Sequence, residues 1–126
     1  IMESLAYNNR WIMAPAEKFM GQNISHARFS GGGALSGLWA QIHADVLGIP
    51  IHQVADPLTT TVKGTALLAF HSLGYLSLEE MANCVNIRKV FQPDPANKHV
   101  YDRLFAGYRS FYQRNKTVFR ALNCER

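Results

Sequence analysis

Apolar residues recur with a period of about 3.6 residues in four stretches of the chain. This period predicts helices over residues 3–20, 34–47, 57–74 and 97–122, with Pro15 marking a kink or an earlier end in the first. The sequence Ser-Leu-Glu-Glu at residues 77–80 is a capping box and predicts one more short helix. The apolar positions expected to be buried in the second and third helices are Leu35, Leu38, Trp39, Ile42, Val46 and Leu47, then Val62, Ala66, Leu67 and Phe70.

Three shorter stretches, residues 24–30, 50–54 and 86–92, predict strands. The resulting order is α-β-α-β-α-α-β-α, which indicates an α/β fold with parallel strands, right-handed crossovers and covering helices. So few short strands make a small sheet for so many helices, because both faces of a parallel sheet are normally covered. We therefore expect that strands of the sheet are missing on the N-terminal side and that the chain is part of a larger protein.

Three consecutive glycines, Gly31, Gly32 and Gly33, lie between a predicted strand and a predicted helix. A glycine turn before a helix N-terminus can bind phosphate through its backbone amides. The turn lacks the Lys-Ser/Thr of a P-loop and misses the G-x-G-x-x-G spacing of dinucleotide-binding folds by one position. On spacing alone, a phosphate-binding loop and a tight structural turn are equally compatible with the sequence.

Composition limits the other function classes. Hydrophobic residues make up 48% of the 126 residues and charged residues 17%, as in globular domains, and no apolar run is long enough to cross a bilayer. The net charge of +4 is concentrated from Lys98 onward, where a solvated helix face is favoured over a nucleic-acid or membrane surface. The two cysteines and five histidines lack metal-ligand spacing, so no metal site is expected, and Asp45 is favoured as a structural partner rather than a Mg²⁺ ligand.

A wider pattern follows the glycines, in the stretches SGGGALSGLWAQIHADVLGIPI, KGTALLAFHSLGYLS and VFQPDPANKHVYDRLFAGYRSFY. In order and spacing it strongly resembles the C-terminal domain of the FGGY-type carbohydrate kinases, most of all the xylulose kinases. The positions that carry the resemblance are Trp39, Gln41, Ala44, Asp45, Pro93, Asp94, Pro95 and Tyr101. The chain departs from the family at Lys63 and Thr65, which replace the usual Leu and Ala beside Gly64.

The resemblance implies a partial actin-like ATPase domain of the ribonuclease-H-like fold, with residues 1–126 as the C-terminal nucleotide-binding domain of a two-domain sugar kinase. The cofactors implied are ATP and Mg²⁺. The implied acceptor sugar is D-xylulose, and ribulose, gluconate and glycerol are left open as alternatives. The implied ATP-binding residues are Gly31, Gly32 and Gly33 at the phosphates, Ala34 and Ser36 beside the adenine and ribose, and Gln41, which fixes the helix on the nucleotide side.

In this family the catalytic carboxylate lies upstream of these residues, so no catalytic residue is expected in the chain. We therefore expect the chain to be inactive alone and to work with an N-terminal domain of the same protein, in the cytoplasm, without nucleic-acid or membrane partners. Without its partner domain the chain would expose the apolar surface of the cleft between the two domains, so we expect it to self-associate. Whether it forms a homodimer is left open. The alternative interpretation is a non-catalytic nucleotide-binding or dimerising module of the same fold.

Overall fold

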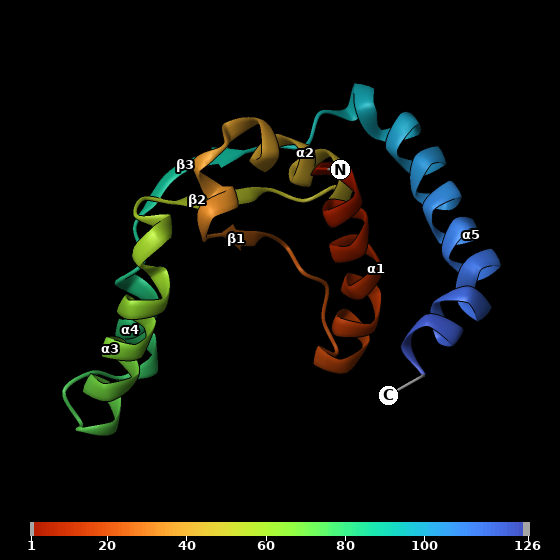
Figure 1. Cartoon of the computed structure of the whole chain (residues 1–126). Coiled ribbons are helices and arrows are strands. Elements are labelled where there is room, and N and C mark those ends of the chain that lie inside the picture. Colours follow the sequence, from red (N-terminus) through yellow and green to blue (C-terminus); the bar gives the residue numbers. More distant parts are fainter. Residues whose placement is uncertain (1, 125–126) are drawn as a thin grey trace.

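A computed structural model describes residues 2–124 of the chain (Figure 1). Its elements are α1 (Met2–Met20), β1 (Ala27–Phe29), α2 (Gly37–Leu47), β2 (Ile51–Val54), α3 (Thr60–Ser72), α4 (Leu78–Asn83), β3 (Ile87–Phe91) and α5 (Lys98–Asn123), with three short 3₁₀ turns at Gly32–Leu35, Pro57–Thr59 and Pro95–Asn97. The predicted α/β element order is confirmed. The helix α1 continues through Pro15, and the Ser77–Glu80 capping box is present.

The three strands form one mixed sheet in the order β1-β2-β3. β1 and β2 are parallel, as predicted, and their register pairs Ala27 with Ile51. The prediction of parallel strands is wrong for β3, which runs antiparallel to β2. The helices α3 and α4 fold back on each other, so the chain returns to the end of the sheet that it left, where the Ala55 amide donates to the Asn86 carbonyl at 2.9 Å.

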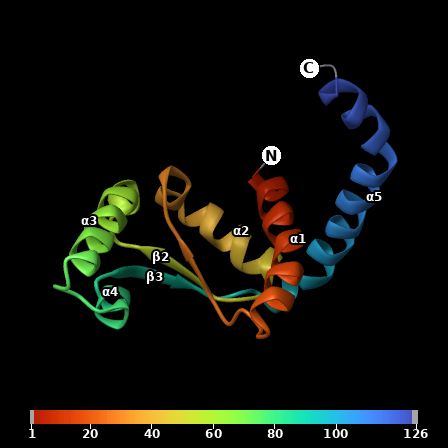
Figure 2. The ribbon, with the colours of Figure 1, turned by 90° about the horizontal axis from the view of Figure 1, so that it is seen from below.

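The helix α2 lies across one face of this sheet, and α1 packs on α2 (Figure 2). Ala40 and Ala44 of α2 pack on Ile51 and Phe91 in the first buried cluster. The small alanine side chains let the helix approach the strands closely. These contacts make α2 the central helix of the chain, and they fix where its N-terminus lies relative to the ends of β1 and β2.

A second buried cluster joins α1, α2 and α5. Tyr7 of α1 is buried with Val46 of α2, and three aromatic rings of α5 pack against it. These rings belong to Tyr101, Phe105 and Tyr108, whose centroids lie 5.6–6.3 Å from that of Tyr7. Aromatic pairs at these separations stabilise a contact beyond the area that they bury. The helical repeat of aromatic residues in α5 therefore serves packing against α1.

The predicted buried face of α3 is wrong for residues 2–124, and that of α2 is right only in part, because Val46 is buried and Ile42 and Leu47 pack against the buried clusters. The helix α3 has no buried residue, and Val62 is 72% exposed. Leu35 and Leu38, predicted to be buried around α2, are 57% and 67% exposed. The helices α3 and α4 extend from one end of the sheet and α5 from the other (Figure 1), so their apolar faces have little of the described chain to pack on. None of the described helices is long and apolar enough to cross a membrane.

Candidate nucleotide-binding site

The glycine turn connects the end of β1 to the start of α2. Gly31 has a φ of 82°, a left-handed conformation that favours glycine, and its amide donates to the Pro57 carbonyl at 2.9 Å. The helix α2 begins at Gly37, not at the predicted Ala34, because the Ser36 hydroxyl accepts a hydrogen bond from the Trp39 amide and caps the helix. The glycines therefore form a 3₁₀ turn ahead of the helix, and the Gly31 amide is already paired.

The three glycines have different surroundings. A Cβ at Gly31 or Gly32 would meet no atom within 4 Å, so the outer side of the turn is open. A Cβ at Gly33 would lie 2.5 Å from Cζ3 of the Trp39 ring, which no real side chain allows. Gly32 therefore presents backbone to open space, while Gly33 is needed for packing against Trp39, whose indole N–H donates to the Met2 carbonyl.

Ala34 is the internal member of the turn. Its side chain is fully buried at 0% exposure, and its carbonyl accepts a hydrogen bond from the buried Gln53 side chain of β2. In this arrangement the methyl group of Ala34 faces the protein interior. Gln53 was not singled out in the sequence, although its place in a β-branched strand beside a glycine turn was a signal. Together, Gln53 and the Pro57 carbonyl attach the turn to β2 and to the segment that follows it.

Gln41 of α2 contacts the connection between β3 and α5. Its amide group donates to the Asp45 carboxylate and to the Gln92 carbonyl, each at 2.8 Å. Asp45 is 7% exposed and also accepts hydrogen bonds from the Asp94 amide and the Asn97 side chain. Gln41 therefore fixes α2 to the connection between β3 and α5, and Asp45 is a structural partner, as the sequence favoured.

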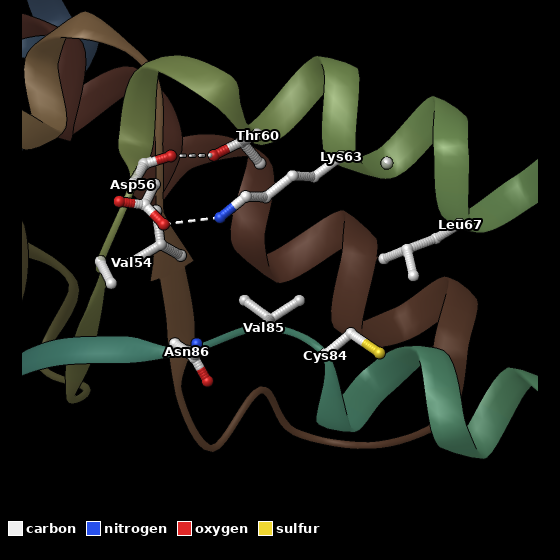
Figure 3. A pocket seen from close by; sticks show the side chains of 10 residues that line it. Val54, Asp56, Thr60, Lys63, Leu67, Cys84, Val85 and Asn86 are labelled. Atoms are coloured by element: carbon white, nitrogen blue, oxygen red, sulfur yellow. Dashed lines mark hydrogen bonds and ion pairs between the residues drawn. The ribbon is translucent and has the colours of Figure 1, made fainter.

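A pocket lies between α3, α4 and the adjoining ends of β2 and β3 (Figure 3). Val54, Leu67 and Val85 supply much of its wall. Lys63, which replaces an apolar residue of the family pattern, forms an ion pair with Asp56 at 2.6 Å at this pocket. Both side chains are more than half exposed, so the pair adds little to stability.

His43 of α2 lies beside the rings of Phe29 and Trp39, and no spacing in the sequence singles it out. Its ring lies 4.8 Å from the Phe29 ring centroid and 5.9 Å from that of Trp39. Nδ1 lies 2.8 Å from the Trp39 carbonyl, which can only accept, so Nδ1 carries the proton, and Nε2 accepts from the Asn9 amide. Burial lowers the pKa of His43, while the hydrogen bond to the Trp39 carbonyl acts in the opposite direction.

Backbone donors at the open Gly32 position and the N-terminus of α2 lie at the carboxyl ends of parallel strands, where α/β proteins bind ligands. The geometry suits an anionic group approached by backbone. Among residues 2–124, no three His, Cys, Asp or Glu side chains come together as a metal site.

Comparisons with known proteins define the class. Residues 1–73 match the model of the C-terminal domain of the FGGY family of carbohydrate kinases. The chain belongs to the FGGY family of carbohydrate kinases.

Sequence relatives include the glycerol kinase of Pseudomonas savastanoi pv. phaseolicola, 29% identical over 91% of this chain and 23% of its own length. Glycerol kinase 2 of Saccharolobus solfataricus is 34% identical over the same shares. Among solved structures, xylulose kinase from Rhodospirillum rubrum superposes with a TM-score of 0.73 and 28% identity, covering 94% of this chain and 24% of that one. The chain thus spans about a quarter of the length of the relatives that it matches, and its fold is that of a partial kinase domain.

Proposed function

We propose that this chain supplies the adenosine and phosphate side of the ATP site in an ATP-dependent carbohydrate kinase that transfers the γ-phosphate to a sugar hydroxyl. The observation that carries the proposal is the open glycine turn at Gly32, held between the end of β1 and the Ser36-capped start of α2. Family membership supports ATP as the phosphate donor. A backbone without side chains lets a triphosphate approach closely, and the N-terminus of a helix favours its negative charge.

Within the turn, the amides of Gly32 and Gly33 are the proposed phosphate donors, while Gly31 holds the turn in place through Pro57. Ser36 and the backbone of Ala34 are proposed to border the adenosine. Gln41 acts indirectly in this proposal, because it fixes the position of α2 through Asp45 and Gln92. The pocket beside Lys63 lies outside this set.

Phosphoryl transfer requires the phosphates to be positioned and their charge to be neutralised. Mg²⁺ supplies part of that neutralisation when bound, and we assign no ligand of the ion to residues 2–124. We also assign no general base to the chain. The proposal is therefore that this chain, together with an N-terminal domain of the same cytoplasmic protein, forms the complete site, and that the chain does not turn over alone.

D-Xylulose is the proposed acceptor. The resemblance of the Trp39, Gln41 and Asp45 pattern to xylulose kinases and the likeness to the Rhodospirillum rubrum enzyme support this choice. The glycerol kinases among the sequence relatives, and a gluconate kinase among the structural ones, make glycerol and gluconate the alternatives to test.

A coupled assay that detects ADP tests the acceptor sugar and the inactivity of the chain alone. It is run with D-xylulose, D-ribulose, glycerol and gluconate on the intact protein and on the 126-residue chain. We expect the highest kcat/KM with D-xylulose and no turnover by the 126-residue chain alone. A preference for another acceptor would correct the substrate. Turnover by the isolated chain would show that it contains a general base.

A further inference from the structure

A β-bulge in β3 brings two neighbouring cationic side chains to the same groove. In the register of the sheet, Gln53 of β2 lies opposite Lys89. The next residue of β2, Val54, lies opposite Ile87, so Arg88 is an extra residue that the pairing skips. In a regular strand Arg88 and Lys89 would point to opposite faces of the sheet. Here both line one groove, because a bulge changes the direction of a side chain.

This cationic groove lies between β3 and the start of α2. Its other lining residues are Leu35, Gly37, Gln53 and Phe91, so none of the described residues that line it is acidic. The Lys89 ammonium lies 4.6 Å from the centroid of the Phe91 ring. Gly37 lies against the same ring, since a Cβ there would be 3.4 Å from Cζ of Phe91. Phe91 therefore holds the ammonium group beside the first residue of α2.

The first turn of α2 adds backbone donors to the groove. The Ser36 hydroxyl accepts from the Trp39 amide, and the Ser36 carbonyl accepts from the Ala40 amide. The amides of Gly37 and Leu38 have no acceptor among residues 2–124. Because the first amides of a helix point out of its N-terminal end, they are donors for a ligand or for solvent.

The charges that surround the cationic groove have one sign. Within residues 2–124, Arg88 and Lys89 form no ion pair, whereas Arg10, Lys63 and Lys98 each pair with an aspartate. A cation at the N-terminus of a helix also has the unfavourable sign for the helix dipole. An anion in the groove would offset both the repulsion between the two side chains and their repulsion by the helix.

Gln53 connects the cationic groove to the glycine turn. Its side chain is 5% exposed, and it donates to the Ala34 carbonyl from a position opposite Lys89. The groove therefore has a fixed position relative to the turn. The two are lined by different residues, since neither Gly32 nor Gly33 lines the groove.

We propose that the cationic groove binds a phosphate group, with the Arg88 guanidinium, the Lys89 ammonium and the Gly37 amide as donors. A guanidinium can donate two parallel hydrogen bonds to phosphate oxygens, and an ammonium binds phosphate as a point charge. Glycine at position 37 lets the anion approach the backbone. The phosphate belongs either to a nucleotide that reaches across from the glycine turn or to a separate phosphorylated small molecule, and the experiment below distinguishes these sources.

Titration of inorganic phosphate into the isotope-labelled 126-residue chain, followed by NMR at constant pH and ionic strength, tests the proposal. The signals to follow are the amides of Gly37 and Leu38 and the side-chain Nε–H of Arg88. We expect these three signals to shift and to saturate at millimolar phosphate. Shifts that stay linear with concentration, or that are no larger than those of the α5 amides, would overturn the proposal.

A pair of double variants separates the groove from general electrostatic attraction. Arg88→Gln with Lys89→Gln should weaken phosphate binding at least about tenfold, because both charge-assisted hydrogen bonds are lost. Lys116→Gln with Arg120→Gln removes the same charges from exposed positions on α5 and should leave the affinity unchanged. Circular dichroism establishes that both variants are folded. Equal weakening in the two would overturn the proposal.

Acetate tests whether the groove prefers phosphate to a carboxylate of an acidic protein segment. Acetate carries one charge and two oxygens, so it satisfies fewer of the donors, and we expect it to bind at least about tenfold more weakly than phosphate. Acetate binding as tight as phosphate binding would overturn the assignment to phosphate.

Saturating ATP identifies the source of the phosphate group. If ATP abolishes the phosphate-dependent shift of the Arg88 Nε–H signal, the nucleotide supplies the group; if the shift persists, a separate phosphorylated molecule does. Both results support the groove. Phosphate binding by a chain that does not bind ATP would support the groove and contradict the proposed function. ATP binding without phosphate binding would support the proposed function and contradict the groove.

Discussion

The backbone of Gly33 lies directly against the indole ring of Trp39, so closely that a Cβ at position 33 would be 2.5 Å from ring atom Cζ3. Trp39 in turn donates its indole N–H to the Met2 carbonyl, which connects the glycine turn through α2 to the start of α1. The third glycine therefore has a packing function, and the second, which meets no atom within 4 Å, remains open to solvent.

This difference predicts opposite outcomes for two alanine substitutions. Gly33→Ala should lower the free energy of unfolding by about 1–3 kcal/mol, because the new methyl group overpacks the site. Gly32→Ala, the matched control, should change it by less than about 0.5 kcal/mol. Urea denaturation followed by Trp fluorescence measures both, and equal effects would contradict the account of the turn.

The hydrogen bonds of the Asp45 carboxylate predict the effect of a second substitution on stability. Its carboxylate accepts hydrogen bonds from Gln41, the Asp94 amide and Asn97, so Asp45→Asn turns an amide N–H toward groups that are themselves donors. A loss of about 2–3 kcal/mol is expected, the usual size for hydrogen bonds to a charged group.

Asp56→Asn is the control for this substitution, because its ion pair with Lys63 is solvent-exposed. It should cost less than about 0.5 kcal/mol in the same urea titration. If Asp45→Asn were as mild as Asp56→Asn, the carboxylate would not be the structural centre of the α2–α5 connection.

The lowered pKa of His43 predicts that the free energy of unfolding depends on pH. Burial lowers its pKa below the ordinary value of 6.5, so the unfolded chain binds this proton at a higher pH than the folded chain does. The contribution of neutral His43 to the free energy of unfolding is therefore complete above about pH 7.5. It decreases as the pH falls below 6.5, with a slope of at most about 1.4 kcal/mol per pH unit.

His43→Gln should flatten the profile of unfolding free energy between pH 7.5 and pH 5, while His99→Gln, at an exposed position, should leave it unchanged. Urea titrations at half-unit steps measure the slope. An unchanged slope in His43→Gln would show that another group controls stability in this range.

Exposed apolar residues of α3 predict self-association of the 126-residue chain. Val62, Leu68 and Phe70 are 72%, 59% and 48% exposed. Sedimentation velocity should show species larger than the monomer, and Leu68→Glu should weaken the association about tenfold, since burying one Leu is worth about 1.5–3 kcal/mol. Gln113→Glu on α5 controls for the added charge. A strictly monomeric wild-type chain would contradict this prediction.

Much of this fold could be predicted from the sequence, because local signals determine it. Helical periodicity, the Ser77–Glu80 capping box and the short β-branched segments gave the correct order of elements. The direction of β3 could not be predicted, because it depends on how α3 and α4 fold back on each other. The start of α2 was predicted too early because a single hydroxyl, that of Ser36, decides it.

The buried faces show the limit of periodicity. An apolar stripe indicates which side of a helix is to be covered, but not whether the covering element is present. Ile12 and Val62 both belong to such stripes and are exposed in residues 2–124. For the candidate site, the glycines were identified in the sequence. Their attachment through Gln53 and Pro57 was not, because those hydrogen bonds join segments about 20 or more residues apart.

Calorimetric titration of ATP into the 126-residue chain and its Gly32→Val variant tests most directly whether the glycine turn binds ATP. A Cβ at position 32 would meet no protein atom within 4 Å, so we expect Val to add bulk at the space assigned to the nucleotide. Circular dichroism first establishes that the variant remains folded. We expect ATP to bind the wild-type chain and to bind Gly32→Val at least about tenfold more weakly, a difference of about 1.4 kcal/mol. Equal affinities, or no binding of ATP by the wild-type chain, would contradict the assignment of this turn to the ATP site.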